Sequence, residues 1–258
     1  MLSLIVSPCV FSVFRFGTGF ATACGSAVSF YNVHMINFLI NSRTVIYWSV
    51  SIILFIGLIA VGMLYSSRVS DVNIKGVRYF SSAVKLNNFQ LNDHNHQNYD
   101  NQRLAGQWNA LFFGYTHCPD ICPTVLLDMS NVYNEYSKRQ DAKELQVVFV
   151  SVDPNRDSLK HLKNYVTYFN PDFLGVTGER KQIDALTKSV GAMYDFEDGI
   201  SGELLTAEQV VDKQGYKVNH YAAIILVNPE GDMVAHIYPP HDLQRVVGAL
   251  GTIININS

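Results

Sequence analysis

The hydrophobic positions divide the chain into one long apolar run and a later part in which short apolar segments alternate with polar ones. Residues 45–65 (VIYWSVSIILFIGLIAVGMLY) contain no charged residue and no proline. About 20 apolar residues are needed to cross the hydrocarbon core of a bilayer as a helix. Core helices of soluble proteins seldom run so long without a polar face. We therefore expect residues 45–65 to be a transmembrane anchor.

The segments around this run suggest four parts. Residues 1–44 are an N-terminal lead, and we expect translation to start natively at Met35, which leaves a short polar segment before the anchor. Residues 66–78 are expected to be a linker, and residues 79–258 a globular domain. Basic residues near the anchor are more numerous after it than before it, which runs against the positive-inside pattern for a translocated C-terminal domain.

In the globular part, short apolar runs separated by amphipathic stretches indicate an α/β domain. Residues 89–98 lead from a strand-like stretch into a polar turn, which predicts an N-terminal hairpin. Asp157 is expected to cap a helix that follows it. Strand, helix, strand, helix, hairpin and helix in this order are typical of a mixed sheet covered by helices. The expected strands span 109–115, 145–152, 221–228 and 233–238, and the expected helices span 124–138, 158–169, 180–191 and 242–250.

The net charge and the cysteine content then narrow the classes of function that the sequence allows. The formal net charge is −3, so electrostatics give no reason to expect a nucleic acid as a partner. The chain has four cysteines, two of them in the N-terminal lead. The remaining pair, Cys118 and Cys122, is not the framework of a small disulfide-rich domain. It indicates a redox site or a metal site.

Cys118 and Cys122 lie between an expected buried strand and an expected helix. Thiols at a helix N-terminus face the positive end of the helix dipole and free backbone N–H groups, which stabilise thiolate. The spacing of three intervening residues directs both sulfurs to one side of the first turn. Two thiolates placed in this way can close into a disulfide or hold a soft metal ion such as Cu(I) or Zn(II).

A two-cysteine metal site usually needs another ligand, and the chain has eight histidines. His220 precedes the strand expected at 221–228, whose start should lie beside the strand–helix junction. The residues alone leave this assignment open, because a histidine at the start of a strand is commonly a surface or capping residue. The side chain of His117 is expected to diverge from the thiolates. The remaining candidates, expected to be solvated, are His94, His96, His236 and His241.

Together these residues resemble the SCO/SenC family of copper-binding assembly factors. The resemblance implies a thioredoxin-like fold with an N-terminal hairpin, tethered by one transmembrane helix. It also implies that Cys118, Cys122 and His220 bind one copper ion. Asn219 departs from the family pattern, in which many members have aspartate, so copper affinity or redox poise is expected to differ. The matching segments are 112–124 (FFGYTHCPDICPT), 151–157 (SVDPNRD), 174–178 (LGVTG) and 218–220 (VNH).

The same resemblance implies a copper metallochaperone that assists assembly of the binuclear copper site of cytochrome c oxidase. The client would be subunit II, an upstream protein would donate the copper, and the ion would be Cu(I) or Cu(II). The alternative, using the same cysteines, is a membrane-anchored thiol–disulfide reductase acting on the cysteines of that site. The N-terminal region lacks an arginine-rich transit pattern, which favours a bacterial inner membrane with a periplasmic domain over the mitochondrial inner membrane.

Three other classes of protein fit the residues less well. A thioredoxin-type enzyme would carry Cys-x-x-Cys and a cis-proline before the strand that faces the cysteines, whereas this chain has Cys-x-x-x-Cys and no proline at residues 218–220. A copper or redox sensor would need an output domain, and nothing in the sequence resembles one. A structural zinc module would need a fourth protein ligand, and no residue presents itself.

Overall fold

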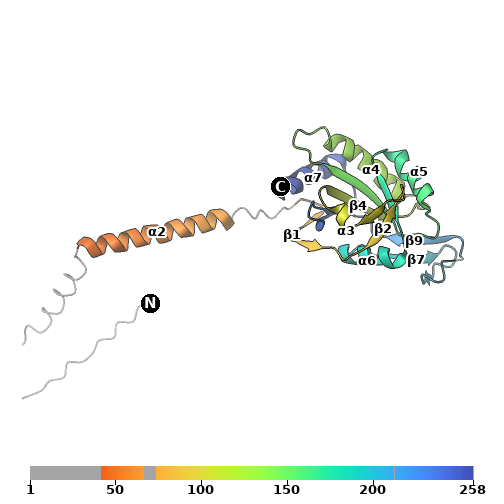
Figure 1. Ribbon diagram of the computed structural model, residues 1–258, viewed down its shortest axis with the longest axis horizontal. Helices are drawn as coiled ribbons and strands as arrows, with labels where there is room; N and C mark the ends of the chain where they lie inside the picture. Colours follow the sequence, from red (N-terminus) through yellow and green to blue (C-terminus); the bar gives the residue numbers. More distant parts are fainter. Residues whose placement is uncertain (1–41, 67–73, 212, 258) are drawn as a thin grey trace, which may run out of the picture. The chain divides into compact units, whose positions relative to one another are not determined.

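The computed structural model describes residues 42–66, 74–211 and 213–257 (Figure 1). The expected N-terminal lead up to residue 41, with the expected start at Met35, lies outside the described residues, as does most of the expected linker. The chain forms two compact units, Met1–Arg68 and Val69–Ser258.

The first unit contains one long helix, α2 (Ser42–Ser66), of 25 residues. Its segment Val45–Gly62 has a mean hydropathy of 2.4, and none of it is buried against protein. At 1.5 Å per residue the helix is about 37 Å long, enough to cross the roughly 30 Å hydrocarbon core of a bilayer. An apolar helix without a protein cover and without a polar face fits a single-pass membrane anchor.

The second unit is built on an eight-stranded mixed sheet with the order β1-β11-β10-β4-β5-β6-β2-β3. The three central strands β4, β5 and β6 run parallel to one another. Every residue of β4 is buried, as expected for a parallel strand covered on both faces. The strands are β1 (Val77–Lys85), β2 (Gln90–Asp93), β3 (Asn98–Asp100), β4 (Trp108–Gly114), β5 (Leu145–Ser151), β6 (Leu174–Thr177), β10 (Ile224–Val227) and β11 (Asp232–Ile237).

Helices join the strands and cover the sheet (Figure 1). Helix α4 links β4 to β5 and contacts both α5 and α7, so these three helices form one layer. Helix α5 packs on β6, and α6 contacts β2. The helices are α3 (Asn101–Leu104), α4 (Ile121–Tyr136), α5 (Leu159–Phe169), α6 (Arg180–Val190) and α7 (Leu243–Ile256).

A second, three-stranded sheet with the order β8-β7-β9 lies outside the main sheet. Strand β7 (Tyr194–Asp198) pairs with β9 (Tyr216–His220) in an antiparallel ladder, and β8 is Leu204–Leu205. This sheet was not predicted, because residues 194–220 are mostly polar and show no continuous apolar run. His220 therefore ends a strand, whereas the sequence analysis placed it immediately before one.

The predicted N-terminal hairpin is confirmed, since β2 and β3 pair antiparallel between Gln90 and Asp100. Strand β1 was missed, and part of it falls in the expected linker. It pairs with β11, and its half-exposed residues alternate too irregularly to stand out as a strand. Helix α4 begins at Ile121, earlier than residue 124, because Pro123 is tolerated in a first turn whose N–H groups have no intrahelical partner.

The predicted N-cap at Asp157 is wrong. Helix α5 is capped by Ser158, whose side chain accepts a hydrogen bond from the His161 N–H at 3.2 Å. The Asp157 side chain is instead fully buried and accepts hydrogen bonds from Thr116 and Ser151. Both Asp157 and Ser158 are good capping residues, and the choice between them depends on contacts with residues distant in the sequence.

Candidate metal centre

The structure brings together Cys118, Cys122 and His220. Their ligand atoms all lie within 4.8 Å of one another. Cys122 Sγ lies 3.3 Å from His220 Nε2, and the Cys122 N–H donates to Cys118 Sγ at 3.5 Å. In the part of the chain that the structure describes, this is the group of cysteine, histidine and acidic side chains that could hold a metal ion.

The two sulfurs are positioned by the junction between β4 and α4. The buried strand β4 ends at Gly114, and the chain then turns, with the Cys118 N–H donating to the Tyr115 carbonyl at 3.2 Å. Helix α4 begins three residues after Cys118, so Cys122 lies in its first turn and is fully buried. Cys118 lies before the helix and is half-buried. The helix N-terminus therefore faces both sulfurs, as the sequence predicted.

Gly114 makes room for the Cys122 sulfur. A Cβ atom at this position would lie 2.6 Å from Cys122 Sγ and 2.9 Å from a ring carbon of Phe149. Both distances are well below van der Waals contact, so a side chain at Gly114 would displace the sulfur or the ring. Gly114 was not predicted to be a site residue, although the sequence places it immediately before the loop that carries the cysteines.

Two aromatic rings hold the imidazole of His220. The rings of Phe112 and Tyr115 stand nearly perpendicular to this ring, with centroid distances of 5.9 and 6.0 Å. The contacts turn Nε2 toward Cys122, while the buried Nδ1 has no hydrogen-bond partner among the described residues. A buried polar atom without a partner is costly, and here it is the ring nitrogen other than the one that faces Cys122. Two sulfurs and one imidazole nitrogen form a donor set that suits a soft metal ion.

The two thiols differ strongly in proton affinity. The hydrogen bond from the Cys122 side chain, assisted by His220 and two backbone N–H groups, lowers the pKa of Cys118 to about 3 although burial opposes this shift. Burial raises the pKa of Cys122 far above its usual range, and the Cys118 thiolate raises it further. These opposite directions favour the thiolate form of Cys118 and the protonated form of Cys122. A bound cation would replace the proton on Cys122.

His94, His236 and His241 were expected to be solvated, and this expectation is wrong because all three are buried. His94 Nδ1 accepts a hydrogen bond from the Gly175 N–H at 3.0 Å. Burial lowers the pKa of each of the three side chains, which favours neutral imidazoles in the interior. The polar turn around His94 and the two prolines that His236 and His241 flank suggested solvent exposure instead.

The position of His117 agrees with the sequence analysis. Its exposed ring stacks on His161 at 5.6 Å and does not join the Cys118 group. Its Nδ1 lies 3.2 Å from Thr116 Oγ1 and 3.5 Å from an Asp157 oxygen. His96 is exposed, as expected.

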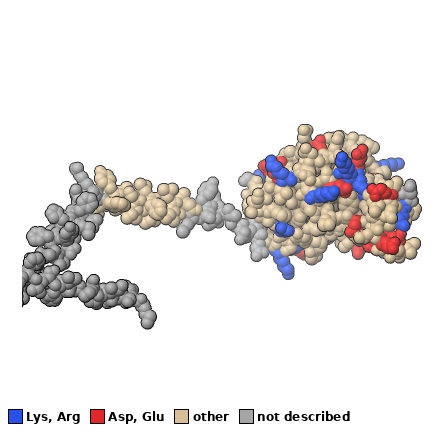
Figure 2. Space-filling view, turned by 90° about the horizontal axis from the view of Figure 1, so that it is seen from below, with Lys and Arg blue, Asp and Glu red and all other residues tan. Residues whose placement is uncertain are grey.

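Asn219 lies on β9 beside His220, and its side chain contacts acidic residues of β7. Its Nδ2 donates to Asp195 at 2.8 Å and to Glu197 at 3.2 Å. Figure 2 shows Asp and Glu side chains gathered at the end of the globular unit that carries these strands. An aspartate at position 219 would face two carboxylates, so the neutral amide avoids like-charge repulsion there.

Proteins of a known family resemble this chain in sequence. A sequence model of the SCO1/SenC family matches residues 80–255. A putative copper-binding protein of Stutzerimonas stutzeri is 34% identical over 161 residues, which cover 61% of this chain and 72% of that protein. A SCO2-like protein of Rickettsia felis is 31% identical over 187 residues, covering 72% and 85%. The mitochondrial SCO2 homolog of mouse is 35% identical over 58% of this chain, which spans about half of that relative (54%).

Solved structures share the fold. Copper-bound ScoI of Arabidopsis thaliana aligns with a TM-score of 0.57 and 27% identity, covering 65% of this chain and 96% of the other. Copper-bound yeast Sco1 aligns with a TM-score of 0.57 and 28% identity, covering 66% and 89%. These likenesses confirm the expected thioredoxin-like α/β fold. With the family match over most of the globular unit, they show that the chain belongs to the SCO1/SenC family.

Proposed function

We propose that this protein is a membrane-anchored copper metallochaperone that holds one copper ion on Cys118, Cys122 and His220. The observation that carries the proposal is the convergence of two sulfurs and one imidazole nitrogen within 4.8 Å. Thiolate ligands favour Cu(I), and imidazole also suits Cu(II). The copper-bound structures of related Sco proteins support copper as the cargo.

The unequal burial of the ligands suggests how copper leaves. Cys122 is fully buried, whereas Cys118 is half-buried at the surface of the loop. An incoming client thiolate can therefore reach the copper from the Cys118 side. Its new bond to copper forms as the bond from Cys118 breaks, so the ion changes ligands without release into solution.

By family resemblance, the client is the binuclear copper site of cytochrome c oxidase subunit II, and an upstream protein supplies the copper. We further propose the division into an anchor at 45–65, a linker at 66–78 and a copper-binding domain at 79–258, although β1 already begins at Val77. The membrane is the bacterial inner membrane, with the domain in the periplasm. The apolar helix α2 and the Rickettsia relative support this placement.

A copper titration of the reduced full chain in detergent micelles tests the proposal. We expect one copper ion per chain with sulfur and nitrogen ligation at the site. A Cys118→Ser/Cys122→Ser double variant is the matched control, because it retains the two N-terminal cysteines, Cys9 and Cys24, and reports any copper that they bind. Equal binding by the wild type and by this variant would contradict the proposal.

The second candidate function is thiol–disulfide reduction of the client. It would use the same cysteine pair, since a nucleophilic thiolate beside a second thiol can reduce a disulfide. The copper-bound structures of related Sco proteins favour the copper function. Absence of stoichiometric copper binding together with rapid exchange with a model disulfide would move the protein to this class.

A further inference from the structure

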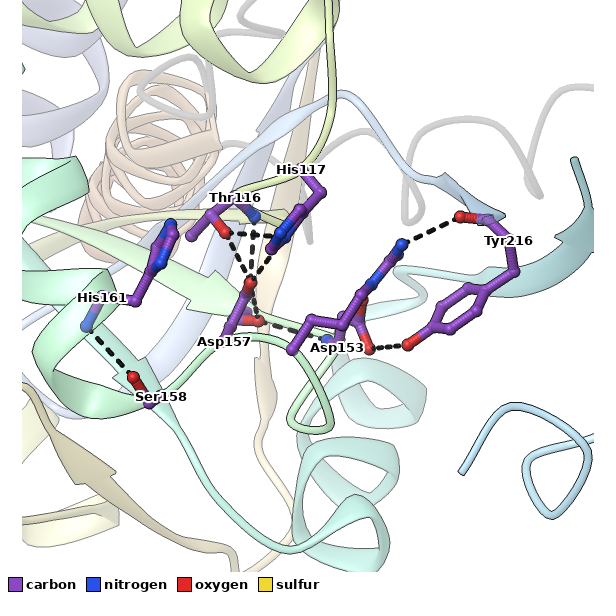
Figure 3. A network of polar contacts seen from close by, with 9 residues as sticks. Thr116, His117, Asp153, Asp157, Ser158, His161 and Tyr216 are labelled. Carbon is purple, nitrogen blue, oxygen red and sulfur yellow. Dashed lines mark hydrogen bonds and ion pairs between the residues drawn. The ribbon is translucent and has the colours of Figure 1, made fainter. Parts of the chain in front are cut away.

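Residues 151–157 (SVDPNRD), which begin with the last residue of the central strand β5, contact the segments that carry the two halves of the candidate metal centre. Figure 3 shows the polar contacts of this segment, with Thr116 and His117 on one side and Tyr216 on the other. The first side leads to the cysteines and the second to His220. We call the contacts on the first side the cysteine arm and those on the second side the histidine arm.

The cysteine arm is centred on Asp157, whose side chain is fully buried. Its carboxylate accepts hydrogen bonds from the Thr116 N–H at 2.9 Å and from the Thr116 hydroxyl at 2.5 Å. It also accepts one from the Ser151 hydroxyl at 2.6 Å. Thr116 lies two residues before Cys118, so Asp157 holds the backbone that presents the half-buried sulfur of Cys118.

The histidine arm consists of Asp153, Arg156 and Tyr216. Asp153 is fully buried and accepts from Arg156 Nε at 2.5 Å and from the Tyr216 hydroxyl at 2.6 Å. Arg156 also donates to the Tyr216 carbonyl at 3.0 Å, and its guanidinium lies 3.7 Å from the centre of the Tyr216 ring. Tyr216 is the first residue of β9, and His220 is the last.

The two arms are joined at Ser151 and at Tyr115. The Ser151 hydroxyl donates to Asp157 and accepts from the Asp153 N–H at 3.1 Å. The Arg156 guanidinium lies 5.5 Å from the centre of the Tyr115 ring, and the same ring packs perpendicular to the ring of His220. A change in either arm can therefore alter the distance between the sulfurs and the imidazole.

The sheet topology explains why such a connection is needed. The cysteines follow β4 of the main sheet, whereas His220 belongs to the separate sheet β8-β7-β9. No strand ladder joins these sheets among the described residues. His220 is tied to the main sheet by residues 221–223, which lead to β10 beside β4, and by the side-chain contacts of the two arms. Two buried carboxylates are costly unless their hydrogen bonds are made, and Asp153 and Asp157 make theirs to the two halves of the site.

We propose that residues 151–157 are a positioning device that sets the geometry between the cysteine pair and His220. Asp157 positions Cys118, while Asp153 and Arg156, through Tyr216 and Tyr115, position His220. This inference rests on the proposed copper site and deepens it. None of the residues 151–157 is a ligand, and their effect on copper passes through the residues that are.

The test is a double-mutant cycle with the full chain in detergent. Cu(II) affinity and the electron paramagnetic resonance spectrum are measured for Arg156→Gln, His220→Ala and the combination. Arg156→Gln is expected to weaken Cu(II) binding about tenfold, as is typical for residues that orient metal ligands, and to reduce the nitrogen coupling in the spectrum. In the His220→Ala background, Arg156→Gln should cost nothing further, since the residue that it positions is gone.

Arg139→Gln is the matched control. Arg139 also pairs with an aspartate, Asp141, at 2.8 Å, but the pair follows the C-terminal end of the 16-residue helix α4. At 1.5 Å per residue this end is about 21 Å from Cys122. Loss of this pair should leave Cu(II) affinity and the spectrum unchanged in both backgrounds.

Two outcomes would overturn the histidine arm, namely an unchanged affinity in Arg156→Gln or an equal loss with and without His220. Tyr216→Phe, which removes the hydroxyl that donates a hydrogen bond to Asp153, repeats the test with a smaller change should Arg156→Gln fail to fold.

Asp157→Asn tests the cysteine arm. It should weaken Cu(I) binding both with His220 and in the His220→Ala background, and full Cu(I) affinity would overturn the cysteine arm. Failure of the proposed function is distinct, because the wild-type chain itself would then not bind one copper ion at the site.

Discussion

The two regions that form the candidate metal centre differ in how firmly the fold holds them. Cys118 and Cys122 follow β4, a strand buried along its whole length and paired on both sides. His220 ends β9, in which buried and exposed residues alternate within a small outlying sheet. Elements with few buried contacts open more easily than core strands. The difference indicates a site whose sulfur half is rigid and whose imidazole half is adjustable.

This asymmetry suits a protein that must hold an ion and then release it. In the proposed copper site the soft thiolates supply most of the affinity for Cu(I), and they follow a strand that is buried along its whole length. His220 lies at the end of an outlying strand, which shares no ladder with the main sheet among the described residues and is joined to β10 by residues 221–223. The predictions below test the two halves separately, starting with the largest expected effect.

Replacement of either cysteine by serine should abolish tight Cu(I) binding. Serine keeps the size of the side chain but substitutes a hard hydroxyl oxygen for a soft sulfur, which Cu(I) disfavours. Competition against a Cu(I) chelator measures the affinity of Cys118→Ser and of Cys122→Ser. Full affinity in either variant would refute the rigid two-sulfur half of the site.

His220→Ala should weaken Cu(II) binding by at least about tenfold and Cu(I) binding by less. The reason is that imidazole matters more to the harder ion, whereas the two sulfurs can hold Cu(I) alone. Parallel titrations with Cu(II) and, under reducing conditions, with Cu(I) give the two affinities. Equal losses for both ions would mean that the imidazole does not play the separate role that the comparison assigns to it.

Gly114→Ala should destabilise the globular unit by about 1–3 kcal/mol, since its Cβ would overlap Cys122 Sγ and the Phe149 ring. Urea unfolding of the metal-free protein measures the change. Gly248→Ala in α7 is the control, because a Cβ there meets nothing within 4 Å and alanine favours a helix by up to about 1 kcal/mol. A loss of stability in both variants would contradict the tight packing assigned to the sulfur half.

The smallest expected effect concerns the reactivity of the cysteine thiols in the metal-free protein. Since the pKa of Cys118 is lowered to about 3, its thiolate persists well below neutral pH. Iodoacetamide at pH 5 should alkylate Cys118 about tenfold faster than an ordinary thiol, after allowance for the weaker nucleophilicity of a low-pKa thiolate. Cys122→Ala removes the hydrogen bond that contributes most to the shift, so it should slow alkylation at pH 5. Mass spectrometry of the labelled peptides gives both rates.

Features that depend on neighbouring residues in the sequence could be predicted from the sequence alone. The anchor helix followed from one uninterrupted apolar run, and the central strands β4 and β5 followed from short apolar runs long enough to be buried on both faces, whereas the short central strand β6 was missed. The placement of the two thiols at a helix N-terminus followed from their position after such a run. In each case the physical cause, burial or helix geometry, acts within a few residues of the chain.

Features that depend on distant residues were decided only by the tertiary structure. The interpretation of His94, His236 and His241 as solvated failed because burial comes from strands far away in the chain. Asp157 has the same capping chemistry in the sequence as Ser158, and contacts with Thr116, 41 residues earlier, assign it elsewhere. The sequence by itself supplied the candidate ligands and their family pattern. Their distances, and the buried carboxylates that link them, depend on how two separate sheets pack, which no local pattern encodes.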